Sequence, residues 1–229
     1  MRDVELRARA AYFDDPAVLV VADVHVGRDE ASDVAFPLGE RDDLRERLDA
    51  LVAHFRPDTV VVAGDVLHTF GYATDRAKTV IAALDDCCRD AGARLVLVRG
   101  NHDTSLEGVW NGTIHDAYRL GDVVVVHGHD HPETSADCYV VGHDHPTIEI
   151  EGQRRPCFLY GEDVYRGSDV LMLPAFNRLA AGVSVNRMGG EDFQSPLVTD
   201  VDAFRPAVYD DDAQETLWFP PLGEFRSML

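Results

Sequence analysis

Aspartate, asparagine and histidine side chains follow five short apolar stretches of this 229-residue chain, and these residue types bind divalent metal ions. Residues two apart on an extended segment project from the same side, so an Asp-x-His or His-x-His pair can reach one ion. The mixture of carboxylate and imidazole, with no cysteine, suits Mn²⁺, Zn²⁺ or Fe²⁺ better than Ca²⁺. The seven candidate ligands are Asp23, His25, Asp65, Asn101, His127, His143 and His145.

The string Gly-His-Asp-His-Pro occurs twice, at 128–132 and at 142–146, so two ligand assignments are open. In the first copy, His129 and His131 are the alternatives to the two histidines of the second. We favour the second copy because His127 already supplies a single upstream histidine and because an apolar strand precedes 142–146.

Each of these residues also has an ordinary structural role to exclude. An Asp after a strand is more often a turn or helix-cap residue than a metal ligand, and a lone His is more often a structural group. We expect His54 and His115 to be structural residues of this kind, not metal ligands. Seven such residues at the ends of five strands are unlikely to arise by chance, and together they predict a metal centre.

The first half of the chain alternates strands with helices. Nearly all-apolar stretches at 17–22, 58–63 and 94–98 are typical of strands covered on both faces. Between them, apolar residues at helical spacing predict helices over 42–55 and 75–91. In such α/β sheets the carboxyl ends of the strands share one edge, so Asp23, Asp65 and Asn101 are expected to converge there.

After Gly100 the expected strands are closely spaced, with no long helix between them. This pattern predicts an antiparallel or mixed sheet that packs against the first half. The segment 191–229 has weak periodicity, and we expect it to be a tail that packs back on the core through Trp218 and Phe219. The expected strands are 122–126, 138–141, 147–150, 157–160, 169–173 and 183–185.

The charge composition is strongly skewed. The chain has 29 Asp, 12 Glu, 20 Arg and a single Lys, Lys78, which gives a formal net charge of −20. This skew resembles that of proteins from salt-loving archaea, in which dense carboxylates stay hydrated where the Debye length is about 3 Å. We therefore interpret the acidity as a solubility device, which excludes no phosphate-bearing substrate.

The cysteines indicate a reducing compartment. Cys87, Cys88, Cys138 and Cys157 have no Cys-x-x-Cys spacing, so they are expected to be buried, reduced thiols. No basic start followed by an apolar signal region occurs, and no apolar run approaches 18 residues. We expect a cytoplasmic protein without a membrane partner.

These motifs resemble, in order, those of the calcineurin-like metallophosphoesterases. The matching strings are Asp23-Val24-His25, Gly64-Asp65-Val66-Leu67-His68, Gly100-Asn101-His102-Asp103, His127 and Gly142-His143-Asp144-His145. Pro146, the string 173–177 and Gly182 are similar to those of archaeal SbcD-related phosphoesterases and bacterial ligase-associated endonucleases. The resemblance implies an α/β fold, a four-layer α/β/β/α sandwich of two mixed sheets flanked by helices. It also implies one phosphoesterase domain over residues 1–229.

The resemblance also implies a role for each residue. It places Asp23, His25 and His145 on one metal ion, Asn101, His127 and His143 on a second, and Asp65 between the two as a bridge. His102 would be the proton donor to the leaving oxygen, with Asp103 orienting its imidazole and His68 beside it. The two divalent ions would be Mn²⁺, with Fe, Zn and Ni as alternatives.

By the same resemblance, the protein hydrolyses phosphodiester bonds of nucleic acid or nucleotides through attack by a metal-bound hydroxide. Arg99, Arg154 and Arg155 are the nearest cationic candidates for binding phosphate, although exposed arginines are common on such a surface. Partners would be DNA or RNA and proteins of DNA repair. The alternatives are a phosphomonoesterase, a cyclic-nucleotide phosphodiesterase, or a non-catalytic binding module of the same fold.

Overall fold

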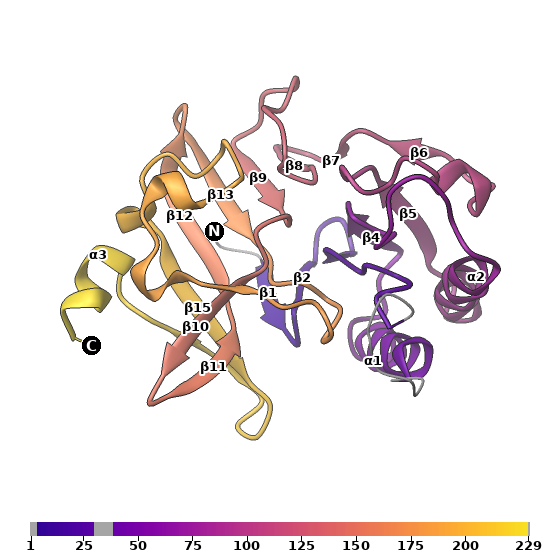
Figure 1. Cartoon of the computed structure of the whole chain (residues 1–229), viewed down its shortest axis with the longest axis horizontal. Coiled ribbons are helices and arrows are strands. Elements are labelled where there is room, and N and C mark those ends of the chain that lie inside the picture. Colours follow the sequence, from indigo (N-terminus) through magenta and orange to yellow (C-terminus); the bar gives the residue numbers. More distant parts are fainter. Residues whose placement is uncertain (1–3, 30–38, 229) are drawn as a thin grey trace.

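The computed structural model describes residues 4–29 and 39–228 and has a mixed α/β architecture of three sheets. The first sheet has the order β1-β2-β3-β4-β5-β6 and lies beside two helices (Figure 1). Its strands are β1 (Val4–Arg7), β2 (Ala10–Phe13), β3 (Val18–Val21), β4 (Thr59–Ala63), β5 (Arg94–Val98) and β6 (Ile114–His115). The helices are α1 (Glu40–Phe55) and α2 (Asp75–Asp90).

The other two sheets contain the second half of the chain. The larger has the order β16-β15-β12-β13-β9-β8-β7, and the smaller β11-β10-β14. The larger consists of β7 (Tyr118–Leu120), β8 (Val123–Val125), β9 (Cys138–Val141), β12 (Phe158–Tyr165), β13 (Ser168–Met172), β15 (Arg205–Asp210) and β16 (Glu215–Trp218). The smaller consists of β10 (Pro146–Ile150), β11 (Gln153–Pro156) and β14 (Val183–Ser184).

The central strands are buried on both faces, which explains why they are almost entirely apolar. In β4, Val60 and Val62 pack toward the helices, whereas Val61 and Ala63 face the seven-stranded sheet. β3, β4 and β5 are neighbours and run parallel, as the alternation of strands and helices predicts. Parallel and antiparallel pairs occur in both large sheets, so the predicted mixed α/β fold is confirmed.

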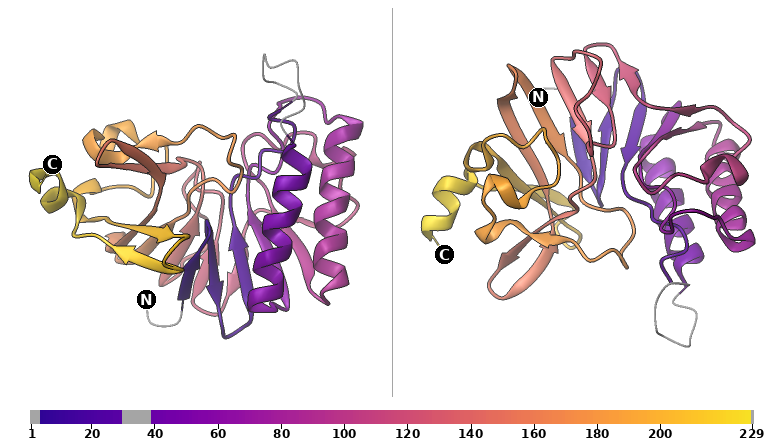
Figure 2. Two further views of the ribbon diagram at one scale, coloured as in Figure 1. Left: turned by 90° about the horizontal axis from the view of Figure 1, so that it is seen from below. Right: turned by 45° about the horizontal axis from the view of Figure 1, so that its top comes forward.

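The two helices cover the outer face of the first sheet, side by side (Figure 2). α2 begins as expected, because the Thr74 hydroxyl caps it by accepting a hydrogen bond from the Ala77 amide at 3.0 Å. α1 begins two residues earlier than the 42–55 expectation, at Glu40, with Gly39 in the left-handed conformation before it. No helix of the described residues is long and apolar enough to cross a membrane.

The outer face of the seven-stranded sheet carries a different kind of layer. In the described chain it is covered by the three-stranded sheet and by short turns of 3₁₀ helix, with the four-residue α3 (Leu222–Phe225) at the far end from α1 and α2 (Figure 2). The fourth layer is therefore built mainly from strands and turns. The 3₁₀ turns are Val185–Arg187, Gly190–Asp192, Val201–Ala203 and Arg226–Met228; a further one, Leu106–Gly108, lies in the first half.

The last 39 residues carry regular structure that the weak periodicity did not reveal. β15 pairs with β12 and β16 with β15, which extends the seven-stranded sheet. The expectation that Trp218 packs on the core is wrong, because Trp218 is 43% exposed. Phe204, Leu222 and Phe225 supply the buried apolar surface instead, with Phe219 packed against them. The four cysteines are free and buried, as expected.

Candidate metal centre

Polar side chains from both large sheets meet at one edge of the molecule. β3, β4 and β5 are parallel neighbours, so Asp23, Asp65 and Asn101 follow strands that end together. In the facing sheet β8 and β9 are also parallel neighbours, and His127 and His143 follow them. The structure thus brings all seven candidate ligands together at the common edge of the two sheets.

The first group consists of Asp23, His25 and His145, whose ligand atoms lie within 4.8 Å of one another. His25 Nε2 is 3.1 Å from His145 Nε2, and His145 Nε2 is 3.3 Å from Asp23 Oδ1. Two imidazole nitrogens and a carboxylate oxygen directed at one point are the arrangement that a divalent cation requires.

The second group consists of Asp65, His127 and His143, again within 4.8 Å, with Asn101 beside them. His127 Nε2 lies 3.1 Å from His143 Nδ1 and 2.9 Å from Asn101 Oδ1. His127 Nδ1 donates a hydrogen bond to the Ala63 carbonyl at 3.2 Å. That bond fixes the tautomer that directs an Nε2 lone pair into the group.

Asp65 lies between the two groups. Its Oδ2 is 3.7 Å from His25 Nε2 in the first group, and its Oδ1 is 3.4 Å from His127 Nε2 in the second. One carboxylate that presents one oxygen to each group has the geometry of a bridge between two cations.

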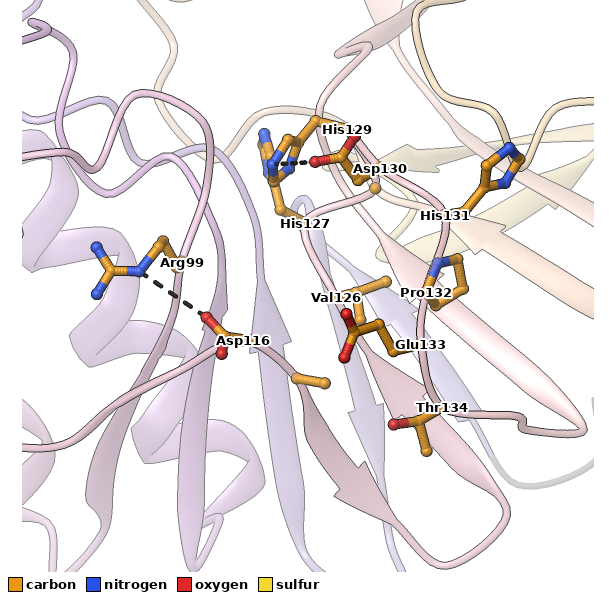
Figure 3. Close-up of a pocket in the computed structure, with 12 residues that line it drawn as sticks. Arg99, Asp116, Val126, His127, His129, Asp130, His131, Pro132, Glu133 and Thr134 are labelled. Atoms are coloured by element: carbon orange, nitrogen blue, oxygen red, sulfur yellow. Dashed lines mark ion pairs between the residues drawn. The ribbon is translucent and has the colours of Figure 1, made fainter.

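The two copies of Gly-His-Asp-His-Pro lie in different surroundings. His143 and His145 of the second copy belong to the two groups, whereas His131 points away from His127 and accepts or donates a hydrogen bond with Tyr165 Oη at 2.8 Å (Figure 3). His129 lies closer, with its ring centroid 5.1 Å from that of His127, and lines a cavity of about 310 Å³ next to the centre.

The electrostatics of the two groups fit cations. Burial, and then the neighbouring Asp23 carboxylate, raise the pKa of Asp65 to about 8. Burial lowers the pKa of His25 and of His127 to about 3, which leaves neutral imidazoles with free lone pairs. Burial also acts to lower the pKa of His145, but the carboxylates of Asp23, Asp65 and Asp144 together outweigh it and raise that pKa. The raised pKa of Asp65 shows that its ionised form is disfavoured beside Asp23, and a divalent cation bound between these carboxylates would stabilise that form.

The backbone at the candidate ligands is strained. Five of the seven have a positive φ, which costs a non-glycine residue about 1–3 kcal/mol where the conformation is sparsely populated. Hydrogen bonds from neighbouring loops hold this geometry, for example from the His25 amide to the Asp65 carbonyl at 2.9 Å. The five are Asp23 (55°), His25 (43°), Asp65 (46°), His143 (75°) and His145 (48°).

Glycines allow the loops to approach closely enough. A Cβ at Gly64 would lie 2.4 Å from the His127 ring, and a Cβ at Gly142 would lie 2.4 Å from Asp23 Oδ2. Neither neighbour can move without leaving its group. The glycine before each of these motifs is therefore required by the packing of one motif against another.

His102 stands at the border between the two groups and solvent. Its Nδ1 donates a hydrogen bond to the His68 carbonyl at 2.8 Å, and its backbone amide donates to Asp65 Oδ1 at 3.0 Å. The free Nε2 then lies 3.8 Å from Asp65 Oδ2 and faces the centre. This position suits exchange of a proton with a group bound there.

The expectation that Asp103 orients the His102 imidazole is wrong. The Asp103 carboxylate is buried and accepts hydrogen bonds from the amides of Val66, Leu67 and Gly100, at 3.2, 2.9 and 2.8 Å. The partner of the His102 ring is instead the backbone carbonyl of His68. A carboxylate buried between two loops accepts hydrogen bonds from their otherwise unpaired amides. Asp103 therefore positions the backbone of the two loops and not the His102 ring.

The side chain of His68 lies beside the centre. Its ring stacks at 6.2 Å on that of His102, and Arg28 Nη1 is 3.4 Å from its ring nitrogens. Burial, and then the Arg28 charge, lower the pKa of His68. His68 thus supports His102 through both its carbonyl and its ring.

The three predicted phosphate-binding arginines differ in their partners. Arg99 lines the cavity beside His127, but it is paired with Glu107 at 2.5 Å and lies 3.9 Å from Asp116 (Figure 3). Arg155 is exposed and donates to Gln153 Oε1. Arg154 donates to Thr147 Oγ1 at 2.8 Å and to the Gly182 carbonyl, and it shares a cavity of about 200 Å³ with His145.

Two supporting residues were not predicted from the sequence. Asn177 is buried, and its Nδ2 donates to the carbonyls of Val24 at 2.9 Å and His25 at 3.2 Å, and to Glu40 Oε1 at 2.9 Å. Glu40 in turn accepts a hydrogen bond from the Gly27 amide at 2.8 Å. Together they hold the loop that carries Asp23 and His25. The string 173–177 contained the signal for Asn177, but Glu40 fell outside the expected helix.

An exposed aromatic ring beside His102 was also not predicted. Phe70 is 57% exposed, and its ring centroid lies 4.0 Å from that of His102. Tyr72 is 67% exposed. The Gly71 amide donates to Thr104 Oγ1 at 3.1 Å, which anchors the loop between them. The exposed Phe70 ring on this anchored loop offers a stacking surface at the rim of the centre.

Comparison with known proteins agrees with this geometry. Residues 16–166 match the family model described as calcineurin-like phosphoesterase. The chain is similar to the Pseudomonas putida nuclease MPE, with 26% identity and a TM-score of 0.63 over 90% of this chain and 91% of that one. It also matches YfcE, a phosphoesterase from E. coli, with 16% identity and a TM-score of 0.44 over 88% and 97% of the two chains. No curated protein matches the sequence significantly.

Two facing mixed sheets with His and Asp groups at their common edge define a metallophosphoesterase. The chain belongs to the calcineurin-like phosphoesterase family, whose model covers more than half of it. It is accordingly a metal-dependent phosphoesterase, a hydrolase that acts on ester bonds.

Proposed function

We propose that this enzyme hydrolyses phosphodiester bonds in nucleic acid, with single strands as the preferred form. The observation that carries the proposal is Phe70, an exposed ring 4.0 Å from His102 at the rim of the metal centre. A nucleobase next to the scissile phosphate can stack there, and such stacking is worth about 1–3 kcal/mol per base. The similarity to a bacterial nuclease supports the same substrate class.

The proposed ligands follow the two groups. Asp23, His25 and His145 would hold one divalent ion, and Asn101, His127 and His143 the other, with Asp65 between them. When bound, the two ions would polarise the phosphoryl oxygens and lower the pKa of an attacking water. We propose Mn²⁺ as the native ion, since a mixed set of carboxylate, amide and imidazole ligands suits it.

The protein's own groups would position the reacting atoms. In its doubly protonated form, His102 would give the Nε2 proton to the leaving oxygen, while its Nδ1–H donates to the His68 carbonyl and so fixes the ring. Asp103 would fix the two loops that carry His102 and Asp65 through its three amide bonds. Residues 1–229 are taken as a single domain, because β15 and β16 complete the same sheet as β12.

The test is a substrate panel with Mn²⁺. We expect faster turnover of bis-p-nitrophenyl phosphate than of p-nitrophenyl phosphate, and cleavage of single-stranded DNA in preference to duplex, because a paired base cannot reach Phe70. Cyclic nucleotides belong in the panel as the third substrate class. A tenfold preference for the monoester with DNA left intact would replace the nuclease proposal with the phosphatase alternative.

Salt dependence tests the interpretation of the acidic composition. The formal charge of −20 should cause self-repulsion when screening is removed. We therefore expect the melting temperature and the activity to fall as KCl decreases from molar concentration to about 0.1 M, where the Debye length reaches about 10 Å. Circular dichroism melts across that range measure the effect. Unchanged stability and full activity at low salt would contradict adaptation to a saline cytoplasm.

A further inference from the structure

Three arginines converge on a third cavity, of about 260 Å³, whose lining includes none of the candidate metal ligands. Arg9, Arg47 and Arg178 line it, and Asp211 is the single carboxylate among the described lining residues. In a chain with 41 acidic and 21 basic residues, a surface cavity is expected to be acidic. We call these three arginines with their cavity the arginine pocket.

The arginine pocket lies on the same edge of the fold as the metal centre. Ala11 pairs with Val20 in the antiparallel pair of β2 and β3, so the turn at Arg9 extends past the end of β3, where Asp23 lies. In the other sheet, the start of β12 is beside the end of β13, so Phe158, which lines the pocket, reaches that edge too.

A continuous path joins the arginine pocket to the candidate ligands. The cavity that contains His145 and Arg154 shares Arg9, Pro156 and Pro174 with the arginine pocket. The two cavities therefore adjoin, and arginines line the path from His145 outward. A chain that carries regularly spaced phosphates could lie along it.

The positive charge in the arginine pocket is incompletely compensated. Arg9 Nη1 donates to the carbonyls of Ala175 at 2.9 Å and Asn177 at 3.3 Å, which carry no net charge. Asp43 is shared, since its carboxylate lies 3.1 Å from Arg178 and 3.6 Å from Arg47. With Asp211, two carboxylates of the described residues face three guanidinium groups.

The electrostatic consequence is that the guanidinium groups disfavour one another. Burial, and then the Arg178 charge, lower the pKa of Arg9 to about 10. Burial and the Arg9 charge lower that of Arg47 to about 10 as well. An anion bound in the pocket would offset the repulsion among the guanidinium groups and so raise the pKa values of Arg9 and Arg47. The planar guanidinium can donate two parallel hydrogen bonds to the oxygens of a phosphate.

We propose that the arginine pocket binds a phosphate group, and that this phosphate belongs to the backbone of the substrate strand, beside the nucleotide at the metal centre. The second part rests on the proposed nuclease function, whereas the first does not. The pocket would give the enzyme a preference for oligonucleotides over small diesters, because only a strand reaches both positions.

The first experiment measures phosphate binding to the full chain with EDTA present, so that no metal can hold the ion. Melting temperatures are compared in inorganic phosphate and in chloride at one fixed ionic strength, for the unmodified protein, Arg178→Ala and Arg9→Gln. Arg178 is 59% exposed, so its loss should leave the fold intact. Arg45→Ala is the matched control, because Arg45 is exposed on the same helix as Arg47.

We expect a saturable rise of the melting temperature in phosphate that is retained in Arg45→Ala and lost in Arg178→Ala and Arg9→Gln. General stabilisation by excluded ions would raise all four proteins equally. Equal shifts in the four proteins would overturn the site itself, whatever the enzyme hydrolyses.

The second experiment identifies the source of the phosphate. With Mn²⁺, Arg178→Ala should raise KM for a single-stranded oligonucleotide about tenfold, the effect of losing a charged hydrogen bond, and leave KM for bis-p-nitrophenyl phosphate unchanged. Arginine-dependent phosphate binding with an unchanged oligonucleotide KM would make the pocket a site for free phosphate and overturn the strand assignment. A rise for both substrates would also overturn it, since a small diester cannot reach the pocket.

Discussion

Asp65→Asn should abolish phosphodiester hydrolysis and the binding of two metal ions together. Asp65 presents one oxygen toward His25 and the other toward His127, at 3.7 and 3.4 Å, and an amide offers one neutral oxygen in place of the shared anion. Metal affinity should fall by more than the roughly 10–100-fold that loss of a supporting group costs. Metal analysis after dialysis, together with the rise in melting temperature on addition of Mn²⁺, measures the change.

The same variant separates loss of metal from loss of fold. Burial and the Asp23 charge disfavour the ionised Asp65 in the metal-free protein, so removal of that charge should not lower the metal-free melting temperature. Asp58→Asn is the matched control, because Asp58 is exposed just before β4, at the opposite end of the strand that leads to Asp65. Two full metal equivalents in Asp65→Asn would refute the bridging assignment.

His102→Ala should reduce turnover by about 10²–10⁴-fold, the usual contribution of a general acid, while both metal ions are retained. The reason is geometric: His102 is fixed by the His68 carbonyl, and its Nε2 faces Asp65 without belonging to either ligand group. The loss should be larger for nucleoside leaving groups than for nitrophenolate, which leaves without a proton. Steady-state rates for DNA and for bis-p-nitrophenyl phosphate supply this ratio.

A purely structural role for His102 would reduce both rates by the same factor, and that result would contradict proton donation. His54→Ala is the control for removal of an imidazole, since His54 lies exposed on α1. Metal content measured in parallel shows whether the loss of turnover comes from the proton donor or from a disturbed centre.

Much of the fold was predictable from local pattern. β5 and β9 have the predicted bounds, β4 differs from its prediction by one residue at one end, and β3 and β13 differ by one residue at each end. Strands buried on both faces must be apolar throughout, which explains this agreement. The strands that were not predicted are β1, β2, β6, β7, β11, β15 and β16. Most of them have two to four residues, and β11 and β16 are mostly exposed, so their sequences carry little of the periodicity that burial imposes.

The candidate ligands were predictable for a related reason. Metal-binding chemistry permits few residue types, and a parallel sheet places the residues after its strands at one edge, so Asp23, Asp65 and Asn101 could be grouped from sequence. The partners of His102 and Asp103 could not. A backbone carbonyl is present at every position and leaves no mark in the sequence, so only the folded loops show that His68 fixes His102.

The sequence by itself determined which residue types can bind metal and which strands carry them. The tertiary structure alone decided which copy of Gly-His-Asp-His-Pro faces the centre, because that choice depends on how the seven-stranded sheet turns each loop. It alone also placed Arg9, Arg47 and Arg178 around one cavity. Those residues come from a hairpin turn, a helix and a distant loop, and contacts at such separations arise from the packing of the sheets, which no local pattern encodes.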